Sequence, residues 1–186
     1  MLRGGIGILI WLYVGLGVVG LGGMFWTESL DALVPSEPIL FFHQIVVGLG
    51  GGAVLVLVTR MLEKFVPTVE ALTHGFAQML GNFSPRHAGL AALASSLGEE
   101  IFFRGFLQSW WGLWLSSLIF ALLHIGPDKR FISWPFLAFG ASLLLGGLMI
   151  YTETIWASVI AHAVVNFVNL NHIQAQGKSA KSLDPV

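Results

Sequence analysis

The sequence predicts an all-α fold: a polytopic membrane helical bundle of about six transmembrane helices plus one interfacial helix. The first observation is composition, because hydrophobic residues make up 55% of the 186 residues and charged residues only 10%, whereas a soluble domain carries roughly 25% charged residues. The second is that apolar runs recur along the chain, several of them as long as the ~20 residues that a transmembrane helix needs. These observations predict one integral-membrane domain without a sizeable soluble part.

Hydropathy divides the chain into six predicted spans and one weaker segment. The first span is too long for a signal-peptide core, and no small-residue cleavage site clearly follows it, so we expect it to be retained. The fourth is short and is stopped by Gly126-Pro127. The six predicted spans lie near Ile6–Phe25, Ile39–Val58, Pro85–Gln108, Leu113–Ile125, Phe131–Tyr151 and Ile155–Leu170.

The weaker segment, residues 63–83, separates the second span from the third. Its apolar residues recur at helical spacing among scattered polar ones, which is typical of an amphipathic helix at the membrane interface. Ser84-Pro85 follows it. This pair indicates a helix start, because serine can cap the first turn and proline suits the first helical position.

If the six spans cross the membrane in alternating directions, the basic residues that flank them all lie on the same side of the membrane. The opposite loops carry acidic residues, and Trp26, Trp110, Trp111 and Trp156 cluster at the same boundary. The positive-inside rule therefore predicts a multi-pass protein of the cell (plasma or inner) membrane with both termini in the cytoplasm. The basic residues on the predicted cytoplasmic side are Arg3, Arg60, Lys64, Arg86, Lys129, Arg130, Lys178 and Lys181.

Composition also excludes several kinds of site. Cysteine is absent, which excludes disulfides, thiolate catalysis and thiolate metal sites. The net charge of -1 leaves no broad basic surface, so nucleic acid is not an expected partner. The lipid bilayer is the first expected partner.

Three ionisable residues interrupt the third predicted span, in the stretch SLGEEIFFRGFL. A charged side chain at membrane depth costs about 2.5–3.5 kcal/mol on insertion scales, so such groups are paired or functional. Glu100 and Arg104 lie one helical turn apart on the same face and can pair. Glu99 is displaced by about 100° around the helix and lacks this partner, as suits a general base. The competing interpretation is a structural ion-pair cluster that locks two helices.

Two other spans carry polar groups at helical spacing. FALLHIG places His124 one turn after Phe120, and AHAVVNF places Asn166 one turn after His162. Because polar groups in spans face the bundle interior, these side chains could converge with Glu99 on one pocket. A carboxylate, two imidazoles and an amide suffice for peptide hydrolysis by an activated water. A single histidine in an apolar span is, by contrast, more often a packing residue.

The three motifs, in this order, resemble those of the CAAX protease and bacteriocin-processing (CPBP) family of intramembrane glutamate proteases, which is related to the type II CAAX prenyl protease. The resemblance covers about residues 84–170 and implies an all-helical core with its site in a membrane cavity. The motifs are Glu99-Glu100-x-x-x-Arg104, Phe120-x-x-x-His124 and His162-x-x-x-Asn166.

The resemblance also implies roles for these residues. Glu99 and His124 would activate the water, and His162 and Asn166 would form the oxyanion hole. Glu100 and Arg104 would fix the helix and tune Glu99, with Phe120 as a further supporting residue. Counting along the spans leaves a conflict of depth, because Glu99 lies near mid-membrane and His124 near the cytoplasmic end. Either the fourth helix is shifted or tilted, or the third begins deeper than Pro85.

On this basis we divide the chain into an N-terminal part with two spans and the interfacial helix (1–83), a CPBP-like catalytic core (84–171) and a polar tail (172–186). The predicted activity is endopeptidase cleavage of a membrane-associated protein or peptide near its C-terminus. In one version of this prediction, the chain is a compact, myxosortase-like sorting enzyme. In another, its substrate carries a lipidated C-terminal tail.

Three alternatives remain open at this stage. His124, His162 and one glutamate could form a His₂Glu zinc site, although we favour a mechanism without metal or other cofactor because the spans contain no H-E-x-x-H. A non-enzymatic membrane scaffold or immunity factor could use the same polar cluster for helix packing. A small transporter with a proton relay is disfavoured because the six spans show no evident repeat.

Overall fold

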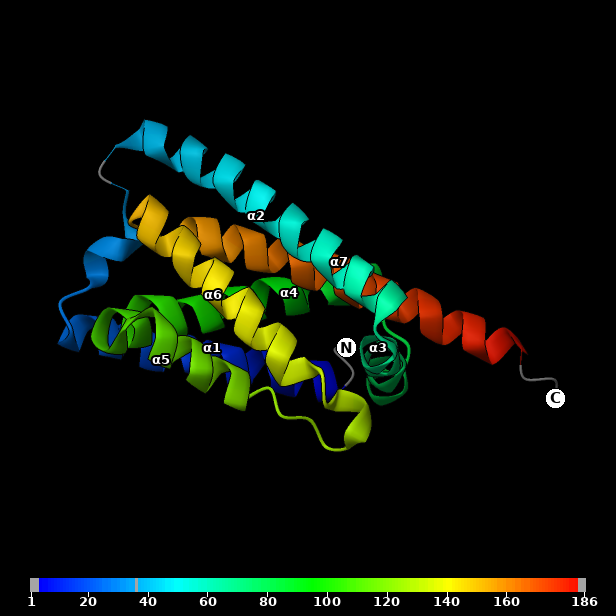
Figure 1. The fold of residues 1–186 in the computed structure, drawn as a ribbon. Coiled ribbons are helices and arrows are strands. Elements are labelled where there is room, and N and C mark those ends of the chain that lie inside the picture. Colours follow the sequence, from blue (N-terminus) through cyan, green and yellow to red (C-terminus); the bar gives the residue numbers. More distant parts are fainter. Residues whose placement is uncertain (1–3, 36, 184–186) are drawn as a thin grey trace.

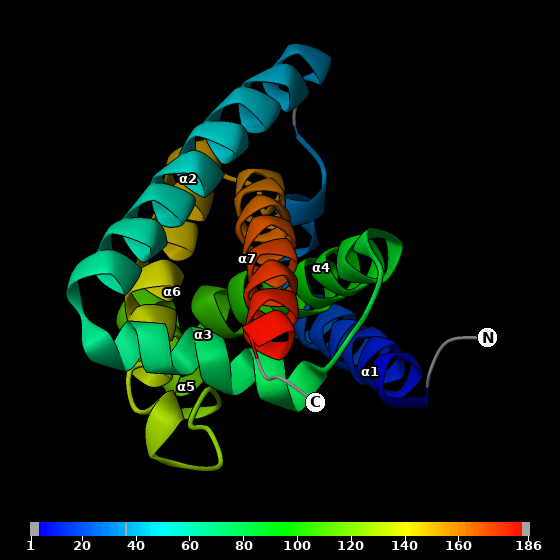
Figure 2. The ribbon, with the colours of Figure 1, turned by 90° about the vertical axis from the view of Figure 1, so that its right-hand side faces the viewer.

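The computed structural model describes residues 4–35 and 37–183, and every regular element in these ranges is a helix. The long helices run alongside one another, and α3 lies crosswise at one end of the bundle (Figures 1 and 2). The predicted all-α class is therefore confirmed. The elements are α1 (Gly4–Trp26), η1 (Leu30–Leu33), α2 (Pro38–Phe65), α3 (Pro67–Leu80), α4 (Pro85–Glu100), η2 (Ile101–Gln108), α5 (Ser109–Leu122), η3 (Lys129–Phe131), α6 (Trp134–Thr152) and α7 (Trp156–Leu183).

Three helical stretches within the described residues are long and apolar enough to cross a membrane. They are Gly7–Trp26 in α1, Leu40–Phe65 in α2, and Lys129–Thr152, which contains α6. These match the predicted first, second and fifth spans, and α2 runs past the predicted end at Val58. The other three predicted spans correspond to α4 with η2, α5 and α7. These helices are too short or too polar to count among those long and apolar enough to cross a membrane. Their placement in the membrane therefore stays a prediction.

The start of α4 agrees with its sequence signal. Ser84 is the N-cap and its hydroxyl accepts a hydrogen bond from the His87 backbone N–H, while Pro85 occupies the first helical turn. The helix then continues into η2, a π-helix that packs against α1, α5 and α6. Hydropathy and helical spacing do not predict this π-helix. π-helical turns are rare and frequent at functional sites, and this one begins directly after Glu100.

A sharp break at Gly112 lies between the third and fourth predicted spans. Gly112 has φ 77° and ψ 173°, a backbone conformation that favours glycine because it lacks a Cβ. The chain reverses there, and α5 returns along η2. Phe103 and Phe120, at nearly equal sequence distances on either side of Gly112, meet with ring centroids 4.9 Å apart. The same hairpin lets Glu99 and His124 line one cavity, and their depth in the membrane stays a prediction.

The predicted amphipathic helix is present as α3. Pro67 begins it, and Val69, Leu72 and Gly75 are its buried residues. These residues face a layer made by α2, α7 and η3. The helix is thus confirmed as a separate element between α2 and α4, and its position at the membrane interface stays a prediction.

The polar tail predicted for residues 172–186 is helical as far as the structure describes it, because α7 continues to Leu183. Side-chain contacts hold this polar extension in place. Gln174 accepts a hydrogen bond from the Phe83 backbone N–H at 2.5 Å and donates one to Asn82 at 3.2 Å. Gly177 lies against Ala77 of α3. These partners lie outside the local sequence, so hydropathy could not reveal them. Residues 184–186 lie outside the described part.

The two ends of the bundle differ in chemistry. At the end opposite α3, Trp26 meets Trp110 with ring centroids 4.8 Å apart, and Trp110 stacks on Trp111 at 4.6 Å. Trp156 donates its indole N–H to the Leu33 carbonyl in the same region. The end with α3 carries the basic residues, and Arg3 of the predicted set lies outside the described residues. The others lie in the last turns of α2 (Arg60, Lys64), the first turn of α4 (Arg86), η3 (Lys129, Arg130) and the end of α7 (Lys178, Lys181).

Candidate functional site

A fully buried ion pair lies at the junction of α4 and η2. Arg104 Nε is 3.0 Å from Glu100 Oε2, and both side chains have no exposed surface. The predicted pairing across one helical turn is therefore present. The structure adds a third member, because Glu100 Oε1 lies 2.7 Å from His162 Nδ1 on α7. Glu100 thus joins its own helix to α7, a contact that sequence spacing could not reveal.

The Arg104 guanidinium makes further contacts on the side of α5 and α6. Nη1 donates a hydrogen bond to Ser142 Oγ at 3.1 Å, and the guanidinium carbon lies 5.2 Å from the centroid of the Phe120 ring. That distance is within the range of a cation–π interaction. Arg104 therefore fixes η2 against two helices besides pairing with Glu100.

The geometry around His162 sets its tautomer. A carboxylate oxygen can only accept a hydrogen bond, so the 2.7 Å contact with Glu100 assigns the Nδ1 proton to His162. The other nitrogen, Nε2, lies 3.8 Å from Glu99 Oε2. This distance exceeds that of a direct hydrogen bond. Glu99 Oε2 is buried and has no hydrogen-bond partner within the described protein.

His124 lies just after the end of α5, with a similarly defined tautomer. Its Nδ1 is 2.6 Å from the Phe120 carbonyl oxygen, which can only accept. Nδ1 therefore carries the proton and Nε2 is left as an acceptor. The ring stacks on Phe120 with centroids 4.3 Å apart and meets the edge of Trp134 at 5.1 Å. The Phe120 ring centroid also lies 6.2 Å from that of His162, so Phe120 neighbours both imidazoles.

Asn166 follows His162 by one turn on α7 and is half-buried. Its Nδ2 donates a hydrogen bond to Ser95 Oγ of α4 at 3.0 Å. The amide has a second N–H, which this contact does not use. Ser95 lies one turn before Glu99 on α4, so the bond also connects α7 to the helix that carries the two glutamates.

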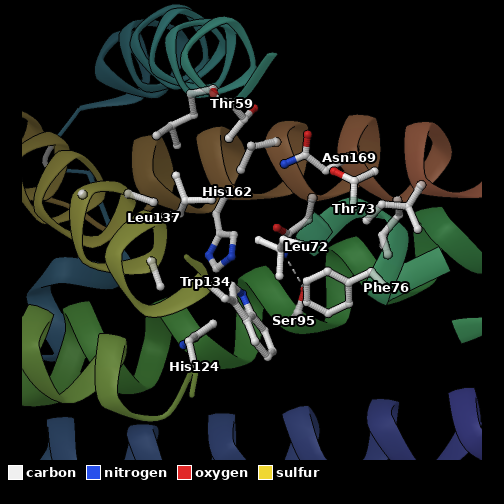
Figure 3. A pocket seen from close by; sticks show the side chains of 18 of the residues that line it. Thr59, Leu72, Thr73, Phe76, Ser95, His124, Trp134, Leu137, His162 and Asn169 are labelled. Atoms are coloured by element: carbon white, nitrogen blue, oxygen red, sulfur yellow. Dashed lines mark hydrogen bonds between the residues drawn. The ribbon is translucent and has the colours of Figure 1, made fainter. Parts of the chain in front are cut away.

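One cavity of about 620 Å³ connects these groups. Figure 3 shows the imidazole of His162 pointing from α7 toward His124 and Trp134, with Ser95 of α4 beside them. All four predicted catalytic residues belong to the lining: Glu99, His124, His162 and Asn166. Arg104 and Glu100 do not, since they lie behind His162. The structure thus brings the four predicted catalytic residues to one site, where the supporting residue Phe120 also lines the cavity while Glu100 and Arg104 do not.

The cavity has a second polar region, near the end of the bundle with α3. Arg60 donates hydrogen bonds to Glu63 at 2.7 Å and to Asn169 at 2.8 Å, and Glu63 also meets His172 at 3.0 Å. Arg60, Glu63 and Asn169 line the cavity. From the sequence, Arg60 is predicted to bear only on topology, and His172 is placed in the polar tail. The i,i+3 spacing of Arg60 and Glu63 was the available signal.

The zinc alternative finds little support in the donor geometry. Within the described residues, no group of three or more histidine, aspartate or glutamate side chains is arranged to hold a metal ion. The site residues therefore do not fit a His₂Glu metal centre in this arrangement.

Comparison with known proteins agrees with the resemblance seen in the motifs. Residues 83–168 match the family described as type II CAAX prenyl endopeptidase Rce1-like. This segment of the chain is similar to the Rce1-like family. It begins one residue before the Ser84 cap and contains all three motifs. The description of the family names an endopeptidase.

A second comparison concerns most of the chain. The uncharacterized protein YpbD of Bacillus subtilis (strain 168) is 27% identical over 149 residues, which cover 78% of this chain and 77% of YpbD. No solved structure gives a significant match. The similarity to YpbD therefore extends beyond the Rce1-like segment into neighbouring parts of the chain.

Proposed function

We propose that this chain is an intramembrane endopeptidase that hydrolyses a peptide bond near the C-terminus of a membrane-associated substrate. The observation that carries the proposal is the convergence of Glu99, His124, His162 and Asn166 on one cavity. Three different segments of the chain supply these groups. Together they provide the carboxylate, imidazole and amide groups that hydrolysis by an activated water needs. The match of residues 83–168 to the Rce1-like family supports the same activity.

In the proposed mechanism, Glu99 and His124 hold and activate the water. His124 Nε2 accepts a hydrogen bond from one water proton, and Glu99 removes the other as the water oxygen attacks the scissile carbonyl carbon. A tetrahedral intermediate with one oxyanion results. Its collapse breaks the C–N bond, and Glu99 returns the proton to the leaving amine, so the enzyme ends in its starting state.

His162 and Asn166 are the proposed oxyanion donors. Asn166 offers the amide N–H that Ser95 does not use. His162 donates through Nε2 when the ring carries both protons, and Glu100, at 2.7 Å from Nδ1, is then its counter-ion. Arg104 and Glu100 act as supporting residues because they lie behind this ring and outside the cavity lining.

We further propose a six-span topology with α3 at the interface and both termini in the cytoplasm. The basic ends of α2, α4, η3 and α7 gather around α3, which the positive-inside rule assigns to the cytoplasmic side. The cavity extends from Glu99 toward this end, where Arg60 and Thr73 line it. The site is therefore proposed to receive its substrate from the cytoplasmic half of the bilayer.

Asn166→Ala should lower kcat by ~10²–10³-fold, the usual effect of removing one oxyanion donor. KM should change little, because the interaction forms mainly in the transition state. Asn166→Asp should be worse, since a carboxylate would repel the oxyanion. The measurement is kcat per folded molecule on a quenched peptide in detergent. A purely structural asparagine, bonded only to Ser95, would instead give a less stable protein whose folded fraction retains full kcat.

The proposal is tested by incubating the purified protein with a panel of C-terminal peptides, lipidated and free, with and without a strong chelator. We expect cleavage of at least one peptide and full activity in chelator, because the donor set does not fit a metal centre. Elemental analysis should find less than stoichiometric zinc. About one tightly held zinc per chain, lost together with activity in His124→Ala, would instead support the metal-dependent alternative.

A further inference from the structure

Tyr13 lies where α1 crosses α4 at the level of Glu99. The side chain is half-buried and lines the same cavity as Glu99 and His162. The two helices approach closely because Gly98, the residue before Glu99, has no side chain. A methyl group there would lie 3.1 Å from Tyr13 Cβ and closer still to the Tyr13 carbonyl. The tyrosine is therefore held beside the glutamate by backbone packing.

The chemistry of this position is unusual for α1. From Gly4 to Trp26 the helix is otherwise apolar apart from tryptophan N–H groups, and Tyr13 supplies its only hydroxyl. Because Tyr13 and Glu99 line the same cavity and the Tyr13 backbone packs against Gly98, that hydroxyl is close enough in the fold to serve as a hydrogen-bond donor for the Glu99 carboxylate. Glu99 Oε2 lies 3.8 Å from His162 Nε2 and has no hydrogen-bond partner in the described protein. A donor from α1 would therefore add a hydrogen bond to a carboxylate whose Oε2 has none.

We propose that Tyr13 is a positioning residue for Glu99. Its hydroxyl donates to the carboxylate and holds the side chain so that a free oxygen faces the space shared with His162, where the water is activated. α1 lies outside the segment that matches the Rce1-like family, so the N-terminal part of the chain completes the site. This inference rests on the proposed function, since positioning has an effect only if Glu99 acts as a base.

The kinetic test is Tyr13→Phe, which removes only the hydroxyl. We expect kcat to fall about 10- to 100-fold, the range for one lost hydrogen bond to a charged group, with KM and melting temperature unchanged. Tyr151→Phe is the matched control, because Tyr151 is exposed at the far end of α6 and should retain full activity. Unchanged kcat in Tyr13→Phe, or a loss of kcat that only follows a loss of folded protein, overturns the proposal.

A spectroscopic test is independent of turnover. The chain has two tyrosines, so tyrosine labelled with ¹³C at Cζ gives two NMR signals, and Tyr151→Phe identifies that of Tyr13. We expect the Tyr13 signal to shift in Glu99→Gln and not in Glu70→Gln, whose side chain is exposed on α3. An unshifted Tyr13 signal overturns the contact even in an active protease. If Glu99→Gln retains normal peptide cleavage, the proposed function fails, whatever the NMR result.

Discussion

Glu99→Gln should abolish detectable peptide cleavage while leaving the protein folded. General-base catalysis contributes ~10²–10⁴-fold to rate, and glutamine cannot take the proton. The fold should tolerate the change, because Glu99 lies outside the Glu100–Arg104 ion pair and its buried Oε2 has no hydrogen-bond partner in the described protein. The neutral side chain of equal size removes a buried charge without leaving a cation unpaired. The measurement is kcat together with the melting temperature in detergent.

Glu70→Gln provides the control for this substitution. Glu70 is exposed on α3, and replacing it by glutamine removes the same charge at a position outside the cavity. The kcat of Glu70→Gln should therefore equal that of the unsubstituted protein. Near-normal turnover by purified Glu99→Gln would contradict the general-base role. A large fall in melting temperature would instead assign Glu99 to the structure.

Glu100→Gln and Arg104→Ala should lose both stability and activity. Removing one partner of a buried ion pair leaves an uncompensated charge, at a cost of roughly 3–5 kcal/mol. Both side chains have no exposed surface, and the pair is separated by 3.0 Å. Glu100→Gln should be the more harmful to kcat per folded molecule, because Glu100 alone contacts His162 Nδ1. Melting temperature and kcat are measured on the same preparations.

Arg130→Ala is the matched control for the buried pair. Arg130 pairs with Asp128 at 2.7 Å, but both side chains are more than two-fifths exposed. Exposed ion pairs contribute little to stability, so melting temperature and kcat should not change. If Arg104→Ala behaves as Arg130→Ala does, the buried pair does not lock η2 to α4 and its supporting role is wrong.

Local sequence patterns predicted those parts of the site that depend on local geometry. The i,i+4 spacing predicted the Glu100–Arg104 pair, and Ser84-Pro85 predicted the start of α4, because both follow from the helix itself. The apolar runs likewise predicted α1, α2 and α6. The inward orientation of His124, His162 and Asn166 followed from the cost of exposing polar groups to lipid.

Contacts between distant segments escaped prediction for a physical reason. No residue near Glu100 in the sequence indicates that Glu100 contacts His162. Likewise, no residue near Tyr13 indicates that α1 places Tyr13 beside Glu99. The extension of α7 to Leu183 depends on Gln174 meeting Phe83 and Asn82. Gly112 was the one overlooked local signal: a glycine between tryptophans inside an apolar run, where the chain in fact reverses.

The scaffold interpretation explains some of these contacts but not all. A lock between helices accounts for Glu100, Arg104 and His162, which are buried together. It does not require a cavity of about 620 Å³ lined by an unpartnered glutamate oxygen and an acceptor nitrogen of His124. The two interpretations therefore differ on whether the cellular role survives the loss of Glu99.

The most direct measurement is mass spectrometry of membrane-protein C-termini in cells that carry the chain or its Glu99→Gln variant at equal abundance. Endopeptidase activity predicts new C-termini, on one or a few membrane-associated proteins, that are present with the unsubstituted chain and absent with Glu99→Gln. Identical C-termini in both cells, with the cellular role of the chain intact in the variant, would contradict proteolysis and favour the scaffold.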